Sequence, residues 1–287
     1  QYSILDGAAP INKLFAAAAA DNQQALAITD HGNMFGVKEF LKVATKYPTV
    51  KPIIGCEFYV SKEGRFLKRG REDQSSYHLV LLAKNIEGYR NLIKLSSYAF
   101  IEGYYYKPRI DRELLERFGS NLICSSACLA GEVPRAIAAG RIEEAEETIL
   151  WYKNLFGEDY YLELQRHETD VPGADTSVFP QQQKVNEVIL KLAAKHGVKC
   201  IATNDVHFVS SDDREAHDRL ICLTTNADYD DPDRLRYSKQ EYLKTQAEMA
   251  EIFSDLPEIL ENTLEIAAKV EVYSIDSKPI MPYFPLP

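Results

Sequence analysis

The stretch Ala25-Leu26-Ala27-Ile28-Thr29-Asp30-His31-Gly32 decides the fold. A short apolar run leads into an aspartate and a histidine, and Gly32 then favours a turn. A run of this length that is bounded by a turn residue predicts a buried strand. In barrels of alternating strands and helices, the reacting groups lie at the carboxyl ends of the strands. The stretch therefore predicts an α/β protein that carries Asp30 and His31 at such an end.

Similar apolar runs with a polar group at one end recur along the chain. They span residues 52–57, 77–83, 121–128 and 198–207. The last run ends in Asp-x-His, and side chains two residues apart on a strand point to the same face. The run 77–83 differs from the others because His78 lies at its start. Polar groups at the ends of five strands predict a polynuclear metal site.

The candidate metal ligands combine carboxylate, imidazole and thiolate groups. They are Asp6, His31, Glu57, His78, Cys128, Asp205 and His207. This set suits Zn²⁺, and its imidazole and carboxylate members also suit Mn²⁺ or Fe²⁺. Clustered ions polarise a phosphoryl oxygen, activate bound water and neutralise the leaving oxygen. We therefore predict phosphoester hydrolysis, with Glu57 and Asp205 as the catalytic carboxylates.

Each of these residues taken alone has a commoner structural explanation. A histidine at a strand end is more often a hydrogen-bonding residue, and a lone cysteine is more often a small buried apolar residue. An aspartate before glycine, such as Asp6, is more often a turn residue. The combination therefore carries the prediction. No chemistry is predicted for the remaining histidines and cysteines, which are His167, His196, His217, Cys56, Cys124, Cys200 and Cys222.

The bulk composition limits the classes of protein. The chain has 287 residues, of which 45% are hydrophobic and 26% charged, as in ordinary globular proteins. Its net charge of −10 argues against general nucleic-acid binding, so any contact with DNA must be local or mediated by metal. The absence of a long apolar run, a signal peptide and a disulfide framework predicts a cytoplasmic protein with reduced thiols and no membrane partner.

The order of the elements predicts one large domain with an extension. Strand-like and helix-like segments alternate from residue 10 to residue 207, which predicts parallel strands joined by right-handed crossovers. We expect a barrel over residues 1–209 and a mainly helical extension over 210–280. The proline-rich residues 281–287 are expected to form a linker.

Two segments could contact nucleic acid, but each has a simpler interpretation. Residues 65–71 form the basic run Arg-Phe-Leu-Lys-Arg-Gly-Arg, and short charge runs are usually solvated loops. Residues 104–109, Tyr-Tyr-Tyr-Lys-Pro-Arg, could stack on bases. Packing of three half-buried tyrosines is the commoner explanation for this second segment.

Six motifs are specific enough to compare with known families. They are Tyr-Ser-x-Leu-Asp-Gly at 2–7, Ile-Thr-Asp-His-Gly at 28–32, Lys-Pro-Ile-Ile-Gly-Cys-Glu at 51–57, Ser-Ala-Cys-Leu-Ala-Gly-Glu at 126–132, Tyr-Leu-Glu-Leu-Gln at 161–165 and Thr-Asn-Asp-Val-His at 203–207. Together they resemble the PHP (polymerase and histidinol phosphatase) domain, in the form found at the N-terminus of bacterial DNA polymerase III alpha subunits. The resemblance covers essentially the whole chain. It implies a distorted seven-stranded (βα) barrel with up to three metal ions at its carboxyl-terminal face.

The resemblance also implies how two of these ions are held. Glu57 would bridge them, His78 and Cys128 would complete one site, and Asp205 would contribute to the other. In family members that keep the ligands, the domain resembles a metal-dependent 3′–5′ exonuclease, which would proofread the single-stranded 3′ end of DNA. In members that have lost the ligands, it is a structural platform that docks a separate proofreading subunit.

The third ion would be held by Asp6, His31 and His207, with Asp30 behind them. The family's active form carries His-x-His just before the first motif, whereas this chain starts at Gln1. Seven of the nine usual ligand positions are therefore filled. The two missing ligands belong to the site that Asp205 shares, so we expect this chain to bind fewer than three ions.

Three functional hypotheses follow. The first is the PHP domain of a DNA polymerase III alpha subunit, with a phosphodiesterase site and with polymerase domains elsewhere in the same chain. The second is a non-catalytic scaffold of that polymerase, braced by structural zinc. The third is a free-standing phosphatase acting on a small phosphoester, which the proline-rich tail disfavours. Residues 1–287 contain no polymerase palm with catalytic aspartates, so we expect no polymerisation by this chain.

Overall fold

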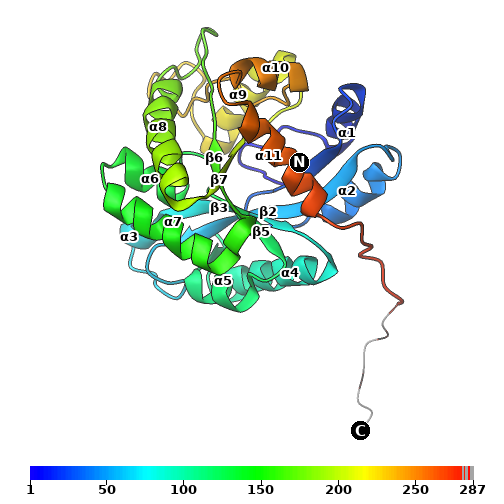
Figure 1. The fold of residues 1–287 in the computed structure, drawn as a ribbon. Coiled ribbons are helices and arrows are strands. Elements are labelled where there is room, and N and C mark those ends of the chain that lie inside the picture. The colour runs from blue at the N-terminus through cyan, green and yellow to red at the C-terminus, as the bar shows by residue number, and fades with distance from the viewer. Residues whose placement is uncertain (280, 282–283, 285–287) are drawn as a thin grey trace.

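A computed structural model describes residues 1–279, 281 and 284, and Figure 1 shows one curled sheet surrounded by helices. The strands are β1 (Ala25–Ile28), β2 (Lys51–Ser61), β3 (Ser76–Ala83), β4 (Arg109–Ile110), β5 (Leu122–Ser125), β6 (Tyr160–Leu164) and β7 (Lys199–Ala202). The helices are α1 (Ile11–Ala20), α2 (Val37–Ala44), α3 (Arg71–Gln74), α4 (Ile86–Ile101), α5 (Arg112–Phe118), α6 (Glu132–Ala138), α7 (Ile142–Phe156), α8 (Val178–His196), α9 (Arg214–Thr225), α10 (Gln246–Ile252) and α11 (Pro257–Lys269). The linker predicted over 281–287 lies outside the described residues, apart from positions 281 and 284.

The sheet is mixed. Its strand order is β1-β2-β3-β5-β6-β7, and β4 pairs with β2 outside this path. β3 runs antiparallel to both of its neighbours, whereas the other pairs are parallel. The prediction of parallel strands throughout is therefore wrong for β3. The polar segment between β2 and β3 forms only the four-residue helix α3, so it supplies no helix long enough to cross over the sheet.

The sheet does not close into a complete ring. β1 and β7 form no ladder with each other in the described part of the chain. A single bridge joins Ala8 to Phe208, and the Ala8 N–H donates to the His207 carbonyl at 2.7 Å. The predicted α/β class and distorted seven-stranded barrel are confirmed, with the distortion at this opening. The N-terminal segment and the loop after β7 therefore meet beside the sheet.

The core packs the strands against the outer helices. β6 is buried along its whole length, and β2 is buried from Ile53 onward. Helix boundaries follow local capping: the Asn85 side chain accepts the Gly88 N–H at the start of α4, and Gly197 in the left-handed conformation ends α8. The strand ends therefore have fixed positions from which side chains can converge.

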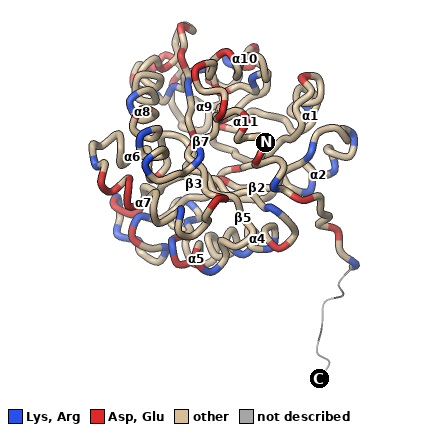
Figure 2. The backbone as a smooth tube through the Cα atoms, in the orientation of Figure 1, with Lys and Arg blue, Asp and Glu red and all other residues tan. Residues whose placement is uncertain are grey.

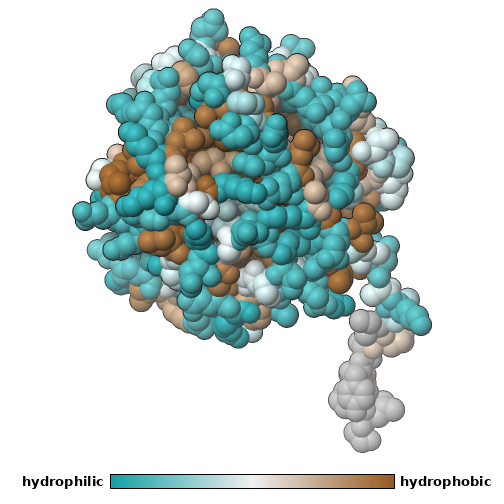
Figure 3. Space-filling view, viewed as in Figure 1, coloured by the Kyte–Doolittle hydropathy of each residue, from teal (hydrophilic) through white to brown (hydrophobic). Residues whose placement is uncertain are grey.

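The predicted helical extension is present as α9, α10 and α11. Helix α11 lies at the amino ends of the strands, because Lys51 at the start of β2 donates to the Ala267 carbonyl and Lys199 at the start of β7 pairs with Glu265. Figure 3 shows that the face carrying α11 is mostly hydrophilic, and Figure 2 shows both signs of charge interspersed along the outer helices. None of the described helices is long and apolar enough to cross a membrane.

The basic run 65–71 differs from the predicted solvated loop. Arg65 is only 3% exposed, and its guanidinium contacts the carboxylates of Asp111, Glu102 and Glu113. The prediction is therefore wrong for Arg65, because a guanidinium whose charge is matched by carboxylates can be buried. Lys68 and Arg71 of the same run are exposed.

The segment 104–109 also differs from prediction. Tyr105 packs as predicted, and its hydroxyl accepts the Gly70 N–H at 3.1 Å. The packing explanation is wrong for Tyr104 and Tyr106, which are exposed. Arg109 is buried, and its guanidinium donates to four backbone carbonyls, which belong to Arg65, Leu67, Asp73 and Gly103. The segments 65–71 and 104–109 thus lie side by side.

Candidate metal centre

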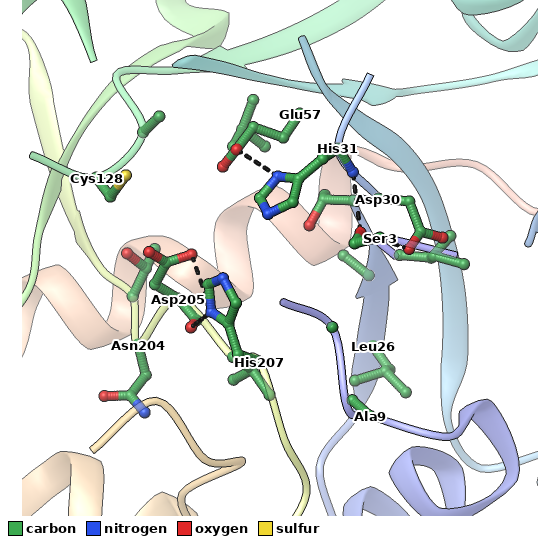
Figure 4. A pocket seen from close by; sticks show the side chains of 18 of the residues that line it. Ser3, Ala9, Leu26, Asp30, His31, Glu57, Cys128, Asn204, Asp205 and His207 are labelled. Carbon is green, nitrogen blue, oxygen red and sulfur yellow. Dashed lines mark hydrogen bonds and ion pairs between the residues drawn. The ribbon is translucent and has the colours of Figure 1, made fainter. Parts of the chain in front are cut away.

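The structure brings all seven predicted ligands to one end of the sheet, as Figure 4 shows for several of them. They come from the N-terminal segment, the loop after β1, the middle of β2, the start of β3, the loop after β5 and the loop after β7. The antiparallel direction of β3 explains His78: the start of β3 lies beside the carboxyl-terminal half of β2, with His78 opposite Tyr59.

His31 lies between two carboxylates. Its Nε2 is 3.1 Å from Asp6 Oδ1, and its Nδ1 is 2.7 Å from Glu57 Oε1. The backbone fixes this arrangement, because the Gly32 N–H donates to the Glu57 carbonyl at 2.7 Å. The loop after β1 therefore continues beside β2 and delivers the imidazole to the middle of the centre.

His78 and Cys128 face the other side of Glu57. His78 Nδ1 is 2.9 Å from Glu57 Oε1 and 3.8 Å from Cys128 Sγ. Cys128 lies in a tight turn in which the Gly131 N–H donates to its carbonyl, and the His78 N–H donates to Ala130. One carboxylate oxygen of Glu57 is therefore shared by two imidazoles, beside a thiol.

Asp205 and His207 lie in the loop after β7, since that strand ends at Ala202. The prediction that both lie on the strand is therefore wrong, although both reach the centre. Asp205 has a φ of +47°, in the left-handed region that few non-glycine residues adopt. His207 Nδ1 donates to the Asp205 carbonyl at 2.6 Å, which leaves Nε2 facing Asp6 Oδ2 at 3.7 Å. The lone pair of a neutral His207 would then point at the centre.

The charges of the centre depend on one another. Burial would lower the pKa of His31, but Glu57 and Asp6 raise it well above the usual value. Burial likewise opposes the charged form of His207, and Asp205 and Asp6 raise its pKa to about 9. Burial would raise the pKa of Glu57, and His78 and His31 lower it. Without metal, the carboxylates of Asp6 and Glu57 are thus ionised, and protons on His31 and His207 supply the positive charge beside them.

The donor set fits a divalent metal. Asp6 Oδ1, His31 Nδ1 and Glu57 Oε1 are buried and have no hydrogen-bond partner among the described residues. They lie within 3.1 Å of an oppositely charged atom, so their contacts are close but poorly aligned for hydrogen bonds. Buried polar atoms without partners are unfavourable. A cation bound among ligand atoms of Asp6, His31 and His207, which lie within 4.8 Å of one another, would satisfy the Asp6 carboxylate.

Other side chains position the predicted ligand His31. Asp30 Oδ1 accepts the Tyr2 N–H and the Ser3 hydroxyl, and Ser3 Oγ in turn accepts the His31 N–H at 3.1 Å. Figure 4 shows Ser3 and Asp30 beside His31, on the side away from Cys128. Asp30 thus orients His31 through Ser3, and it makes none of the close contacts within the centre.

Sequence reasoning missed three residues at the centre. Tyr237 donates its hydroxyl to Asp6 Oδ2 at 2.9 Å, and His217 Nε2 contacts the Asp6 carbonyl at 2.9 Å. Both come from the segment after residue 210, and no spacing in the sequence links them to Asp6. Tyr59 packs its ring against His78 with a centroid separation of 5.3 Å. Its position two residues after Glu57 on the same strand is a signal that could have identified it.

Comparisons with known proteins bear on this geometry. Residues 1–167 match the family model described as PHP domain. The chain is 46% identical to DNA polymerase III subunit alpha of Borreliella burgdorferi and 43% identical to that of Treponema pallidum, and each alignment covers 100% of this chain and 24% of the relative. A solved amidohydrolase from Chromobacterium violaceum shares 16% identity at a TM-score of 0.43, covering 71% of this chain and 84% of that one.

The chain spans about a quarter of the length of the curated relatives that it matches. The predicted likeness to the PHP domain and to DNA polymerase III alpha subunits is confirmed by the family match and by the identity over the full chain. This chain belongs to the PHP domain family.

Proposed function

We propose that the chain is the PHP domain of a DNA polymerase III alpha subunit and that its centre hydrolyses phosphodiester bonds at the single-stranded 3′ end of DNA. The observation that supports this most directly is the shared Glu57 oxygen, which lies 2.7 Å from His31 and 2.9 Å from His78. A carboxylate between two imidazoles, with a thiol beside one of them, is a donor set suited to adjacent divalent ions.

The ligands divide into two groups in this proposal. Asp6, His31 and His207 would hold one ion, and Glu57 would share a second with His78 and Cys128. Asp205 would contribute to a third in a form that also carries His-x-His. Zn²⁺ is the expected metal, with Mn²⁺ or Fe²⁺ as alternatives. Bound metal would supply Lewis-acid activation of the phosphoryl group and of water.

Residues of the chain itself would orient the attacking water and accept its proton. Asp205 has a side chain that is 25% exposed, whereas the Asp6 and Glu57 side chains are 7% and 6% exposed. Asp205 is therefore the carboxylate best placed to accept a proton from attacking water. A cavity of about 330 Å³, lined by Glu57, Cys128 and Asp205, adjoins the centre and is large enough for a nucleotide.

The proposed partners follow from this reaction. They are DNA, polymerase domains of the same chain and, as a further candidate, a separate proofreading subunit, all in the cytoplasm. A second function is a scaffold without catalysis. It is favoured by the fact that His31 and His207 each lie within 3.7 Å of the Asp6 carboxylate, so these imidazoles are already paired with a carboxylate without metal.

Metal content and hydrolysis test the proposal together. We would measure metal per chain by elemental analysis and 3′–5′ degradation of single-stranded DNA. The measurements would be made on this chain and on a longer form that carries His-x-His ahead of Gln1. Glu57→Gln should lower both metal content and hydrolysis in the longer form, because the bridging charge is lost.

Glu146→Gln is the matched control. It removes a carboxylate that also contacts a histidine, His196, at 2.7 Å, but on helix α7. This variant should keep both metal and activity. If neither form retains metal, or if Glu57→Gln leaves hydrolysis unchanged, the phosphodiesterase proposal fails and the scaffold function remains.

A further inference from the structure

A row of exposed aromatic side chains lies near the metal centre. Phe35 and Tyr106 are 68% and 66% exposed, and Phe100 and Tyr104 are also exposed. The ring centroids of Phe35 and Phe100 are 6.3 Å apart, and those of Phe100 and Tyr104 are 6.2 Å apart and stacked. We call Phe35, Phe100, Tyr104 and Tyr106 the aromatic row; Tyr106 follows Tyr104 by two residues, and its ring contacts that of Tyr105 at a centroid separation of 4.8 Å. Large exposed apolar patches mark interaction sites.

The backbone at Tyr106 is strained without a compensating core contact. Its φ of +60° lies in the left-handed region, which is unfavourable for a bulky residue. The Tyr105 N–H donates to the Lys107 carbonyl at 3.1 Å, and this tight turn directs Tyr105 inward and leaves Tyr106 exposed. Strain that burial does not offset is often associated with binding sites. The turn therefore points to a ligand for the Tyr106 ring.

Lys107 connects the aromatic row to the centre. Its Nζ lies 4.3 Å from the centroid of the Tyr59 ring, which itself packs against His78 and His31. Burial lowers the pKa of Lys107, and the carboxylates of Asp6 and Glu57 oppose that effect. Lys107 forms no salt bridge with the residues that the structure describes. Its ammonium is thus available at the edge of the centre.

The basic run adds positive charge beside the same turn. Arg109 donates to the carbonyls of Arg65 and Leu67, which holds the run against the segment that carries the aromatic row. Lys68 and Arg71 are exposed, and neither forms a salt bridge within the described part of the chain. Exposed cations next to stacking rings are the usual components of single-strand binding surfaces.

We propose that the aromatic row, Lys107 and the run 65–71 form a path along which single-stranded DNA lies while its end occupies the metal centre. The bases stack on the rings, and the phosphates face Lys107, Lys68 and Arg71. Stacking is tolerant of sequence, as a site that degrades any 3′ end requires. The inference rests on the proposed function, since the centre gives the strand its direction.

Binding without metal isolates this surface from the chemistry. We would measure the anisotropy of a 5′-labelled oligothymidylate of about 12 nucleotides in the presence of a chelator, because single-strand sites span roughly 4–16 nucleotides. The double variant Tyr104→Ala/Tyr106→Ala should bind at least about fivefold more weakly, the lower limit for loss of one stacked base. Leu264→Ala, an exposed apolar residue of α11 at the opposite end of the sheet, should bind as the unchanged chain does.

An abasic oligonucleotide separates stacking from charge. The unchanged chain should bind it more weakly than oligothymidylate, and the double variant should bind the two alike. Lys107→Gln should lower the slope of log K against log salt by about 0.7, the value for one phosphate contact on a single strand.

Hydrolysis of bis(p-nitrophenyl) phosphate distinguishes failure of the path from failure of the centre. In the longer form that carries His-x-His, the double variant should hydrolyse this small diester normally while the KM for DNA rises. If that form shows no hydrolysis but DNA binding still depends on the aromatic row, the path stands and the phosphodiesterase proposal falls. If the double variant binds oligothymidylate as tightly as the unchanged chain, or if the unchanged chain does not bind it, the path is refuted and the row contacts protein instead.

Discussion

Replacing Arg109 by methionine tests whether this guanidinium joins the two surface segments. Arg109 is 1% exposed, and it donates at 2.9 Å to the carbonyls of Gly103, Asp73 and Arg65 and at 2.8 Å to that of Leu67. Methionine fills much of the same volume but donates no hydrogen bond. The substitution therefore leaves these carbonyls without their partner while changing the packing little.

The magnitude follows from the burial of those carbonyls. Three of the four bonds are buried, whereas the bond to the Leu67 carbonyl is only partly buried, so water can replace it. An unsatisfied buried polar group costs about 1–3 kcal/mol. The low end applies here, because removing the guanidinium also removes its own desolvation penalty and the loop can relax. We therefore expect Arg109→Met to lower the free energy of unfolding by about 3–5 kcal/mol.

Urea unfolding followed by Trp151 fluorescence measures this loss, and amide hydrogen exchange over 65–75 shows where it acts. Arg109→Lys should recover less than half, because one ammonium cannot reach all four carbonyls. Arg90→Met, which breaks a surface pair with Glu87, should change stability by less than about 0.5 kcal/mol. A loss below about 1 kcal/mol for Arg109→Met, with unchanged exchange in the loop, would refute the reasoning.

Three further predictions concern the centre. Burial raises the pKa of Glu163, although the hydroxyls of Ser125 and Thr203 donate to its carboxylate. Burial of the neutral Glu163 therefore contributes fully to the free energy of unfolding below the usual glutamate pKa, and this contribution is lost as pH rises. In the presence of a chelator, the free energy of unfolding should then fall by up to about 1.4 kcal/mol per pH unit, and Glu163→Gln should remove this pH dependence. The same pH dependence in the variant and in the unchanged chain would contradict the prediction. Gly131→Ala places a Cβ 2.0 Å from the Ser126 carbonyl oxygen. We therefore expect the free energy of unfolding in urea to fall by about 1–3 kcal/mol and metal binding to weaken. An unchanged free energy of unfolding would contradict the close approach. Zn²⁺ binding near pH 7 should release on the order of two protons, because the pKa values of His31 and His207 are raised. Calorimetry in buffers of different ionisation enthalpy measures this release. No proton release would mean that these imidazoles were already neutral.

The candidate site was predictable from the sequence because strand ends carry it. His31, Glu57 and Cys128 follow or end short apolar runs, and a curled sheet brings such ends together. The same pattern predicts His78, although His78 starts its run. The prediction of parallel strands would have placed it at the opposite edge of the sheet. The antiparallel direction of β3 resolves this conflict, and the chain direction of a short strand is not encoded in its own apolar pattern.

Long-range contacts are the part that the sequence pattern could not give. Tyr237 reaches Asp6 across 231 positions of the chain, and no local period or spacing reports such a pair. The burial of Arg65 and Arg109 escaped prediction for the same reason. Whether a basic residue is solvated depends on which carboxylates or carbonyls the fold places beside it.

The segment after α9 shows why the candidate metal centre does not belong to the sheet alone. The Asn204 side chain donates to the carbonyls of Gln240 and Tyr242, at 2.8 and 2.7 Å, and the His207 N–H donates to the Glu241 carbonyl at 2.7 Å. These bonds hold the loop in which Asp205 adopts its left-handed conformation, and a conformation of this kind persists only where its surroundings impose it. Two candidate ligands, Asp205 and His207, are therefore positioned by residues beyond 209. The candidate site therefore uses residues on both sides of the predicted boundary at 209. A barrel that ends at residue 209 would retain every proposed ligand but lose the contacts that fix Asp205 and His207.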